Sequence, residues 1–250
     1  MNSSPVFDDY SRYYDLLYND KDYIGEVEYI DSLLKEYGIS GNELLEFGSG
    51  TGNYGRLLAE KGYNVLGIER SQKMVAETRQ TEGFNCQEYD IRSVSLGRTF
   101  NAVLALFHVI SYQTSNSDLQ AVFQRAAEHL EMGALFLFDI WYTPAVNHLK
   151  PTTRVKRITN NEVELTRIAE PNVFPNENRV DVNYTIFVQN KKADTFQTLS
   201  ETHSMRHLSI PEIDLLAKST GFQRLAVEEF FTGAKVDEQT WGVCFVLKKI

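Results

Sequence analysis

The 250-residue chain is poor in the features that mark secreted, zinc-binding or membrane-spanning proteins. It has two cysteines, Cys86 and Cys244, which lie far apart and without metal-ligand spacing. A disulfide framework and a zinc site are therefore not expected, and a reducing, cytoplasmic location is the simpler interpretation. The first residues lack the basic and apolar regions of a signal peptide. No apolar run approaches the roughly 20 residues needed to cross a bilayer, so no membrane association is expected.

Basic charge is also scarce. The 34 acidic residues outnumber the 25 lysines and arginines and give a net charge of −9. Such a surface repels a long polyanion, so nucleic acid is not an expected partner. The segment 150–210 differs, with nine basic against seven acidic residues. This segment suits a small anionic substrate, although a solvated sheet of mixed charge is the simpler explanation. The sequence does not indicate an oligomeric state.

Strands and helices alternate in the first half of the chain. The last helix of this half, with Leu119 and Val122 in its apolar stripe, has a possible capping box at Ser117 and Gln120. Strands are predicted over 43–47, 64–68, 84–88, 101–106 and 134–140, and helices over 24–37, 53–61, 71–80 and 117–132. This alternation predicts an α/β fold with a Rossmann-like, doubly wound, mostly parallel sheet covered on both faces.

The pattern changes after residue 141. No helical period runs through 154–208, where short segments alternate between apolar and polar residues and Pro171 and Pro175 indicate turns. We expect an antiparallel β insertion here, followed by a helix capped by Ser209 and Glu212 and two closing strands. The predicted parts are an N-terminal helical lid over 1–40, a cofactor-binding core over 41–150 and 209–250, and the insertion over 151–208, which forms part of the substrate site.

A glycine-rich turn joins the first buried strand to the helix that follows it. Glycine at alternate positions in Gly48-Ser49-Gly50-Thr51-Gly52 lets the backbone approach a ligand closely. In an open parallel sheet, ligands bind at this end of the strands. Gly50-x-Gly52-x-x-Gly55 also fits the dinucleotide fingerprint, with Glu69 placed to take ribose hydroxyls. An NAD(P)-dependent oxidoreductase therefore remains an alternative at this point.

With Glu46 before it, the turn resembles the first motif of class I S-adenosylmethionine-dependent methyltransferases. The resemblance implies S-adenosyl-L-methionine as the cofactor. It also implies that Glu69, which ends the second strand, binds the ribose, and that Asp90, just past the third strand, contacts the adenine. The candidate cofactor-binding residues are Tyr14, Glu46, Gly48, Ser49, Gly50, Gly52, Glu69, Arg70, Met74, Asp90, Ile91 and Leu106.

Segments 13–18, 96–103 and 106–112 are similar to the N-methyltransferases that dimethylate amino groups on nucleotide-linked sugars in macrolide antibiotic pathways. The similarity covers most of the chain. It implies that Tyr14 lies near the cofactor, that Leu106 and 108–112 line the transfer centre, and that the insertion helps to form the sugar-nucleotide site. The chain departs from that family at His108, where those enzymes carry a small residue. It departs again at 237–241, which replaces a stretch containing glycine and arginine.

His108 and Tyr112 are the candidate catalytic residues. His108 follows the fourth strand at the edge where the cofactor is expected, and an imidazole titrates near neutral pH, which suits a general base. A histidine with a purely structural hydrogen bond is the alternative. Nothing in the sequence distinguishes an amine from a hydroxyl acceptor, so a small-molecule O-methyltransferase stays open. A binding module that has lost catalysis also stays open.

Aromatic residues supply most of the candidate substrate contacts. Tyr10, Tyr14 and Tyr18 recur every four residues on one helix face. They either pack against the core or form a lid whose ring faces the sulfonium. Trp141 and Tyr142 follow the fifth strand and serve either as core filler or as cavity wall.

His203 and His207 lie on one face of a predicted strand, roughly 13 Å apart, which is too far for a shared metal ion. With Arg206 they either border the substrate cavity or face solvent. The candidate substrate residues are Tyr10, Trp141, Tyr142 and Arg206, and no metal site is expected.

Overall fold

Alternating apolar residues build the central sheet in the computed structural model, which describes residues 11–250. In β5 (Leu130–Tyr142), Phe136 and Phe138 face one buried apolar cluster, whereas Leu135 and Leu137 face another. Successive side chains of a strand point to opposite faces, so this run buries both faces of the sheet. Because both faces are buried, both need a covering layer of helices.

The core strands follow the order β3-β2-β1-β4-β5-β11-β10. Neighbouring strands are parallel except β11, which is antiparallel to both β5 and β10. The other core strands are β1 (Glu43–Phe47), β2 (Asn64–Glu69), β3 (Phe84–Glu88), β4 (Phe100–Ala105), β10 (Phe222–Glu229) and β11 (Gly242–Lys249). The predicted α/β fold with a mostly parallel sheet is confirmed.

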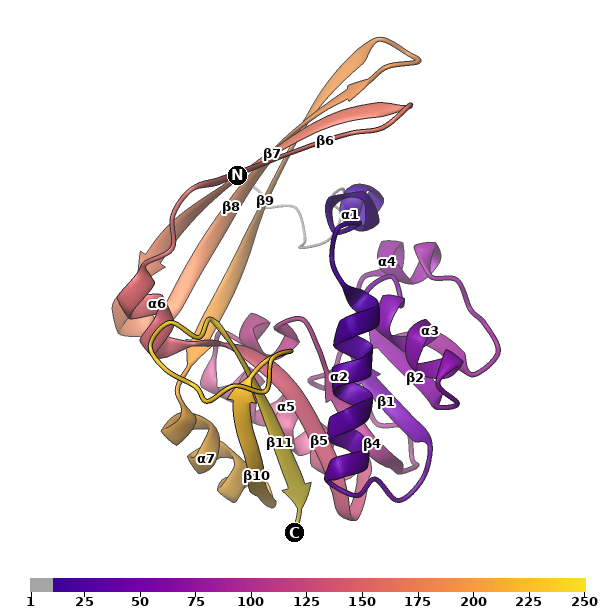
Figure 1. The fold of residues 1–250 in the computed structure, drawn as a ribbon, viewed down its shortest axis with the longest axis vertical. Coiled ribbons are helices and arrows are strands. Elements are labelled where there is room, and N and C mark those ends of the chain that lie inside the picture. The colour runs from indigo at the N-terminus through magenta and orange to yellow at the C-terminus, as the bar shows by residue number, and fades with distance from the viewer. Residues whose placement is uncertain (1–10) are drawn as a thin grey trace.

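Helices cover both faces of this sheet (Figure 1). Residues of α2 (Tyr23–Glu36) and α3 (Asn53–Glu60) join one apolar cluster. Residues of α5 (Asn116–Glu128) and α7 (Ile210–Ser219) join the other. The shorter helical segments are α1 (Ser11–Leu17), α4 (Gln72–Glu77), α6 (Thr143–Leu149), and the 3₁₀ turns η1 (Val109–Tyr112) and η2 (Pro175–Glu177). Among residues 11–250 no helix has the length and apolar character that a membrane span requires.

Side-chain caps mark the starts of α5 and α7. Ser115 caps α5, because its Oγ accepts the N–H of Asp118 at 3.0 Å. The predicted capping box at Ser117 and Gln120 is therefore wrong, since α5 has already begun at Asn116. At α7 the predicted support from Ser209 and Glu212 is confirmed, and the two residues form a capping box.

The predicted antiparallel insertion is present as four strands paired in sequence order. The strands are β6 (Arg154–Thr159), β7 (Val163–Phe174), β8 (Arg179–Asn190) and β9 (Thr195–Leu208). Pro175 opens the turn η2 as expected, but Pro171 lies inside β7. The turn predicted at Pro171 is wrong, because β7 continues through Pro171 in its pairing with β8. On its other side β7 pairs with β6 only as far as Ala169. Beyond that point β7 has a free edge, where a residue without an N–H is tolerated.

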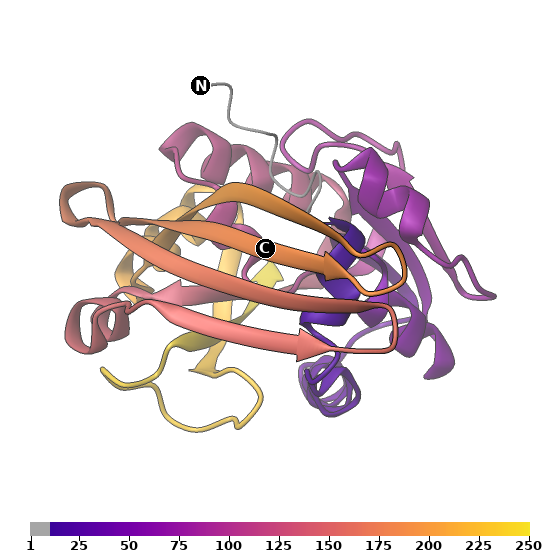
Figure 2. The same cartoon turned by 90° about the horizontal axis from the view of Figure 1, so that it is seen from above.

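The insertion sheet lies across the carboxyl ends of the core strands (Figures 1 and 2). Strand β9 joins it to the core by pairing His207 with Trp141 and Leu208 with Tyr142. Helix α1 lies beneath the insertion, with Leu17 fully buried against an apolar cluster of β7, β8 and β9. The Asp15 carboxylate of α1 accepts the Thr51 hydroxyl at 2.7 Å. Helix α1 therefore connects the insertion to the glycine-rich turn.

Candidate functional site

A cavity of about 400 Å³ lies between the core and the insertion. Its size is within the range of small-molecule sites. Residues at or just past the carboxyl ends of β1, β2, β3, β4 and β5 line one side, and residues of the insertion line the other. Helix α1 contributes Tyr14, and Tyr18 follows directly after it. The cavity therefore lies where the sequence predicted a ligand.

The glycine-rich turn after β1 forms part of the cavity wall. Gly48, Ser49 and Gly50 line the cavity, whereas Gly52 does not. Gly48 has a φ of +68°, and a Cβ there would lie 2.5 Å from a methyl carbon of Val109. A Cβ on Gly52 would meet the ring of Phe84 at 2.5 Å, so the absence of a side chain at Gly52 serves packing behind the turn.

Glu46, predicted as a cofactor contact, is buried beneath the turn and does not line the cavity. Its Oε2 accepts the Ser49 hydroxyl at 2.8 Å. Burial raises the pKa of Glu46 to about 8, the Ser49 hydrogen bond opposes that shift, and the nearby Glu69 carboxylate adds to it. Glu46 therefore supports the turn from below and does not face the ligand space.

Glu69, at the end of β2, faces the cavity and is anchored by backbone N–H groups. Its Oε2 accepts the Gly50 N–H at 3.0 Å, and its Oε1 accepts the Ser71 N–H at 2.8 Å. Burial raises the pKa of Glu69, and the hydrogen bonds from Ser71 and Gly50 counteract that rise. Each carboxylate oxygen has a second lone pair. The two oxygens can therefore accept two adjacent hydroxyl groups of a ligand.

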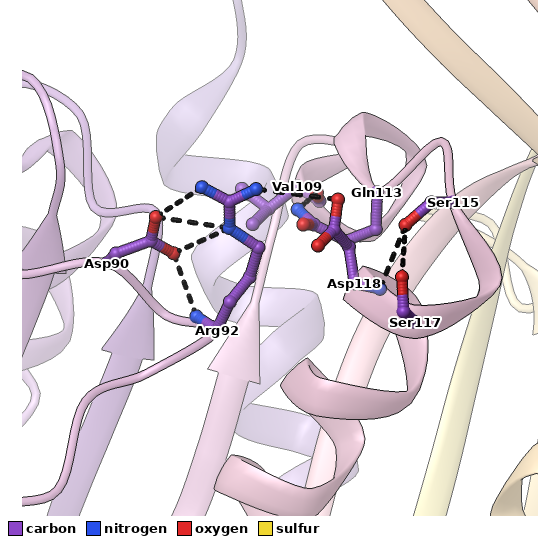
Figure 3. A network of polar contacts seen from close by, with 7 residues as sticks. All are labelled: Asp90, Arg92, Val109, Gln113, Ser115, Ser117 and Asp118. Carbon is purple, nitrogen blue, oxygen red and sulfur yellow. Dashed lines mark hydrogen bonds and ion pairs between the residues drawn. The ribbon is translucent and has the colours of Figure 1, made fainter.

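Asp90 follows β3 and lines the cavity in an ion pair with Arg92 (Figure 3). Arg92 Nε lies 2.9 Å from Asp90 Oδ1, and Arg92 Nη1 lies 3.4 Å from a carboxylate oxygen of Asp118. The hydrogen bond from Arg92 lowers the pKa of Asp90. Arg92 was not among the predicted site residues, although its place two residues after Asp90 in the motif was a usable signal. The remaining predicted cofactor residues that line the cavity are Tyr14, Arg70, Met74, Ile91 and Leu106.

His108 lies in the wall beyond β4. Phe107 and His108 have φ values of +61° and +65°, a backbone conformation that costs non-glycine residues roughly 1–3 kcal/mol and persists mainly at functional sites. The His108 N–H donates to Asp139 Oδ1 at 3.1 Å. His108 Nδ1 lies 2.5 Å from Asp139 Oδ2, which is ion-pair distance without the angles of a hydrogen bond. Asp139 was missed, although an aspartate within an apolar strand was a signal for it.

Tyr112 contacts a histidine of the insertion across the cavity wall. Tyr112 Oη lies 2.9 Å from His203 Nδ1, and His203 Nε2 lies 3.2 Å from Glu201 Oε2. The side chains of His203 and Glu201 are each 2% exposed. The solvent-facing alternative for His203 and His207 is wrong, because both are buried. Glu201 was missed, because its approach to Tyr112 through His203 depends on how β9 packs against η1.

The other predicted substrate residues have different positions. Trp141 lines the cavity, with its ring 6.1 Å from His108 and 5.4 Å from Trp241. Tyr142 packs against the apolar core instead. Arg206 donates to Asn116 Oδ1 at 2.7 Å and does not line the cavity. Tyr10 lies outside the described residues.

Tyr14 and Tyr18 pack with ring centroids 4.8 Å apart, and both line the cavity.

Within residues 11–250 no three histidine, cysteine, aspartate or glutamate side chains are grouped as a metal ion would require.

The chain is similar to known methyltransferases in sequence. Residues 44–133, from β1 to the start of β5, match the methyltransferase domain family. The chain is 30% identical over 139 residues to dTDP-3-amino-3,4,6-trideoxy-alpha-D-glucopyranose N,N-dimethyltransferase of Streptomyces venezuelae, covering 54% of this chain and 59% of the relative. It is 27% identical over 176 residues to dTDP-3-amino-3,6-dideoxy-alpha-D-glucopyranose N,N-dimethyltransferase of Streptomyces fradiae, covering 69% of each.

The likeness extends to solved structures over nearly the whole chain. The crystal structure of Streptomyces venezuelae DesVI superposes with a TM-score of 0.81 at 21% identity, covering 97% of this chain and 99% of that one. At this identity the structural likeness concerns the fold, including the insertion.

Proposed function

Because the chain is a class I S-adenosylmethionine-dependent methyltransferase, we propose that it transfers a methyl group to the amino group of a nucleotide-linked sugar. The alternative of an NAD(P)-dependent oxidoreductase is accordingly dropped. The observation that carries the proposal is the single cavity shared by Glu69 and Asp90 on the core side and by Arg154, Tyr184 and His203 on the insertion side. One side suits the cofactor, and the other suits an acceptor.

The core side fits the cofactor. We assign Glu69 to the two ribose hydroxyls, because each of its oxygens already accepts one N–H and keeps a second lone pair. We assign Asp90, held in one orientation by Arg92, to the adenine end. Tyr14 and Tyr18 line the cavity, where a cation–π contact between an aromatic ring and a sulfonium would contribute about 0.5–2 kcal/mol. When bound, S-adenosyl-L-methionine supplies an electrophilic methyl group.

The insertion side fits an anionic acceptor. Among the cavity-lining residues the carboxylates are Glu69 and Asp90, both on the core side. The insertion contributes the guanidinium of Arg154 and the aromatic ring of Tyr184. Cationic and aromatic groups suit a phosphorylated, ring-containing molecule. The curated relatives named above act on dTDP-linked amino sugars by their names, which supports the same acceptor class here.

The residues of this chain contribute mainly by positioning. Holding an acceptor nitrogen in line with the methyl carbon supplies several kcal/mol of the barrier reduction. We propose that helix α1 acts as a lid, since it contacts both the insertion and the glycine-rich turn. His108, set against Asp139, is placed to take a proton from an acceptor that arrives protonated.

The test combines a titration with an acceptor panel. Purified full-length protein is titrated calorimetrically with S-adenosylhomocysteine and NADPH. It is then incubated with S-adenosylmethionine and a dTDP-linked amino sugar, the free amino sugar, or the dTDP-linked sugar with hydroxyl in place of amine. We expect S-adenosylhomocysteine to bind. We also expect a mass increase of one or two methyl groups only on the dTDP-linked amine. Methylation of the hydroxyl compound would establish the O-methyltransferase alternative. Saturable cofactor binding without product on any acceptor would establish a binding module.

A further inference from the structure

We propose that Tyr112, His203 and Glu201 form a proton relay that takes the proton released by the acceptor. This inference rests on the proposed methyl transfer, because it assigns the route of that reaction's proton. The three side chains come from two parts of the chain, η1 and β9, and meet at the wall of the cavity. Tyr112 and His203 both line the cavity, and Glu201 lies behind them.

The contacts define which atom donates in each step. A carboxylate only accepts hydrogen bonds, so Glu201 Oε2 accepts a hydrogen bond from His203 Nε2–H across 3.2 Å. The neutral imidazole then has a lone pair on Nδ1, which accepts the Tyr112 hydroxyl across 2.9 Å. The arrangement therefore selects one tautomer of His203. It also directs the Tyr112 hydrogen toward His203 Nδ1.

Burial of this pair argues against a purely incidental contact. Residues 199, 201, 203 and 205 of β9 alternate with exposed or half-buried residues and form its inner face. Leu199 and Met205 are apolar, as expected, but Glu201 and His203 interrupt that face while only 2% of each side chain is exposed. Burying polar or charged groups is costly unless they are paired. The pairing seen here leads to a hydroxyl at the cavity, which gives the buried pair a use.

The proton route balances. As the acceptor nitrogen bonds to the methyl carbon, the carbon–sulfur bond breaks and its electron pair stays on sulfur. The N–H proton then passes to Tyr112 Oη while the Tyr112 hydrogen passes to His203 Nδ1. His203 becomes an imidazolium whose Nε2–H faces the Glu201 carboxylate, and Tyr112 ends as a neutral phenol. Burial raises the pKa of Tyr112 well above its usual value, so a standing phenolate is disfavoured and the proton must be passed on.

The first test reads the tautomer directly and needs no acceptor. In full-length protein labelled with ¹⁵N-histidine, long-range proton–nitrogen spectra report which ring nitrogen of each histidine carries the hydrogen. We expect His203 to be protonated on Nε2, and its Nδ1 signal to move in Tyr112→Phe. His207 is the matched control, because it is buried on the same face of β9 and bonds Thr143 instead. The relay would be overturned if His203 carries its hydrogen on Nδ1. It would also be overturned if the Nδ1 signal of His203 does not move in Tyr112→Phe.

The second test separates relay from structure by kinetics. We expect Tyr112→Phe and His203→Gln each to lower kcat at least about tenfold. The KM for the acceptor and the affinity for S-adenosylhomocysteine should stay within about twofold, as for a group needed only in the transition state. The double variant should lose no more than the worse single variant, because both remove one route. His207→Gln should keep wild-type kcat.

Multiplying losses in the double variant, or a wild-type kcat in Tyr112→Phe, contradicts the relay even if the enzyme methylates its acceptor. If wild-type protein methylates no acceptor, the proposed function fails, and the histidine spectra still decide whether the hydrogen-bond route exists.

Discussion

The two walls of the cavity differ in how their side chains are held. On the core wall, Glu69 is fixed by the backbone N–H groups of Gly50, in the turn after β1, and Ser71, in the turn after β2. On the insertion wall, His203 is fixed by other side chains, Tyr112 and Glu201. The core wall is thus determined by local turns at strand ends. The insertion wall depends on how a separate sheet packs onto the core.

In the proposed function, this difference separates the cofactor side of the cavity from the acceptor side. Backbone-anchored carboxylates at strand ends suit a cofactor that many acceptors share, because the parallel sheet alone creates them. Side chains on an added antiparallel sheet can change without disturbing that core. We therefore expect substitutions at Glu69 and Asp90 on the core wall to change cofactor affinity, and substitutions on the insertion wall to change kcat or the acceptor KM.

Glu69→Ala should have the largest effect on binding. It removes both predicted ribose hydrogen bonds and leaves the Gly50 and Ser71 N–H groups without their carboxylate. Affinity for S-adenosylhomocysteine should fall at least about 100-fold, equivalent to about 2.7 kcal/mol. Calorimetric titration measures this loss, and Glu46→Gln is the matched control, because Glu46 is also a buried carboxylate but does not line the cavity. Unchanged binding by Glu69→Ala would refute the assignment of the whole core wall.

His108→Ala and His108→Asn should lower turnover at least about tenfold and leave cofactor affinity nearly unchanged. The reason is that His108 follows β4 and lies against the buried Asp139, where we propose that the methyl group is transferred, whereas Glu69 ends β2. Single-turnover rates and S-adenosylhomocysteine titrations measure the two quantities. Asp139→Asn should reproduce the turnover loss if the pair acts together. Wild-type turnover in both His108 variants would remove this residue from the mechanism.

The same contrast explains which site residues the sequence could predict. Gly48, Glu69 and Asp90 follow buried strands at readable positions, and each lines the cavity. Tyr142 and Arg206 were misplaced because neighbouring positions of one strand face opposite ways, and the period alone does not say which faces the ligand. Arg206 is adjacent to His207 and two residues before Leu208, where β9 pairs with β5.

The larger fold was predictable for a similar reason. Strands β1 and β3 have the predicted bounds, because the apolar run of β1 ends at a glycine-containing turn and the alternating residues of β3 end at a polar one. The pairing of β9 with β5 links residues far apart in the sequence, and no local pattern indicates it. The contacts of Tyr112 with His203 and of His108 with Asp139 are likewise tertiary, so only the structure reveals them.

Glu46→Gln should change how the free energy of unfolding depends on pH, because Glu46 is a buried carboxylate beneath the turn. Burial raises the folded-state pKa of Glu46 to about 8, so the folded protein holds a proton that the unfolded chain releases near its ordinary, lower pKa. The stabilising contribution is present in full below that ordinary pKa and is lost as the pH rises through about 8. In that window wild-type stability should fall by up to about 1.4 kcal/mol per pH unit from this group. Denaturant unfolding at several pH values should show a shallower fall for Glu46→Gln, and parallel curves would contradict the burial argument.

Arg154→Ala should have the smallest effect and test the insertion wall alone. Arg154 is exposed at the edge strand β6, and exposed ion pairs contribute about 0.2–1 kcal/mol, so the acceptor KM should rise roughly 1.4- to fivefold. Cofactor affinity should not change. The difference from wild type should shrink at high salt, because screening weakens an exposed contact to a phosphate. Arg157→Ala is the matched control, since Arg157 lies on the same strand but faces the other way and does not line the cavity. Equal KM changes in the two variants would mean that β6 attracts the acceptor only through its overall charge, and the insertion wall would then lose its one specific cationic contact.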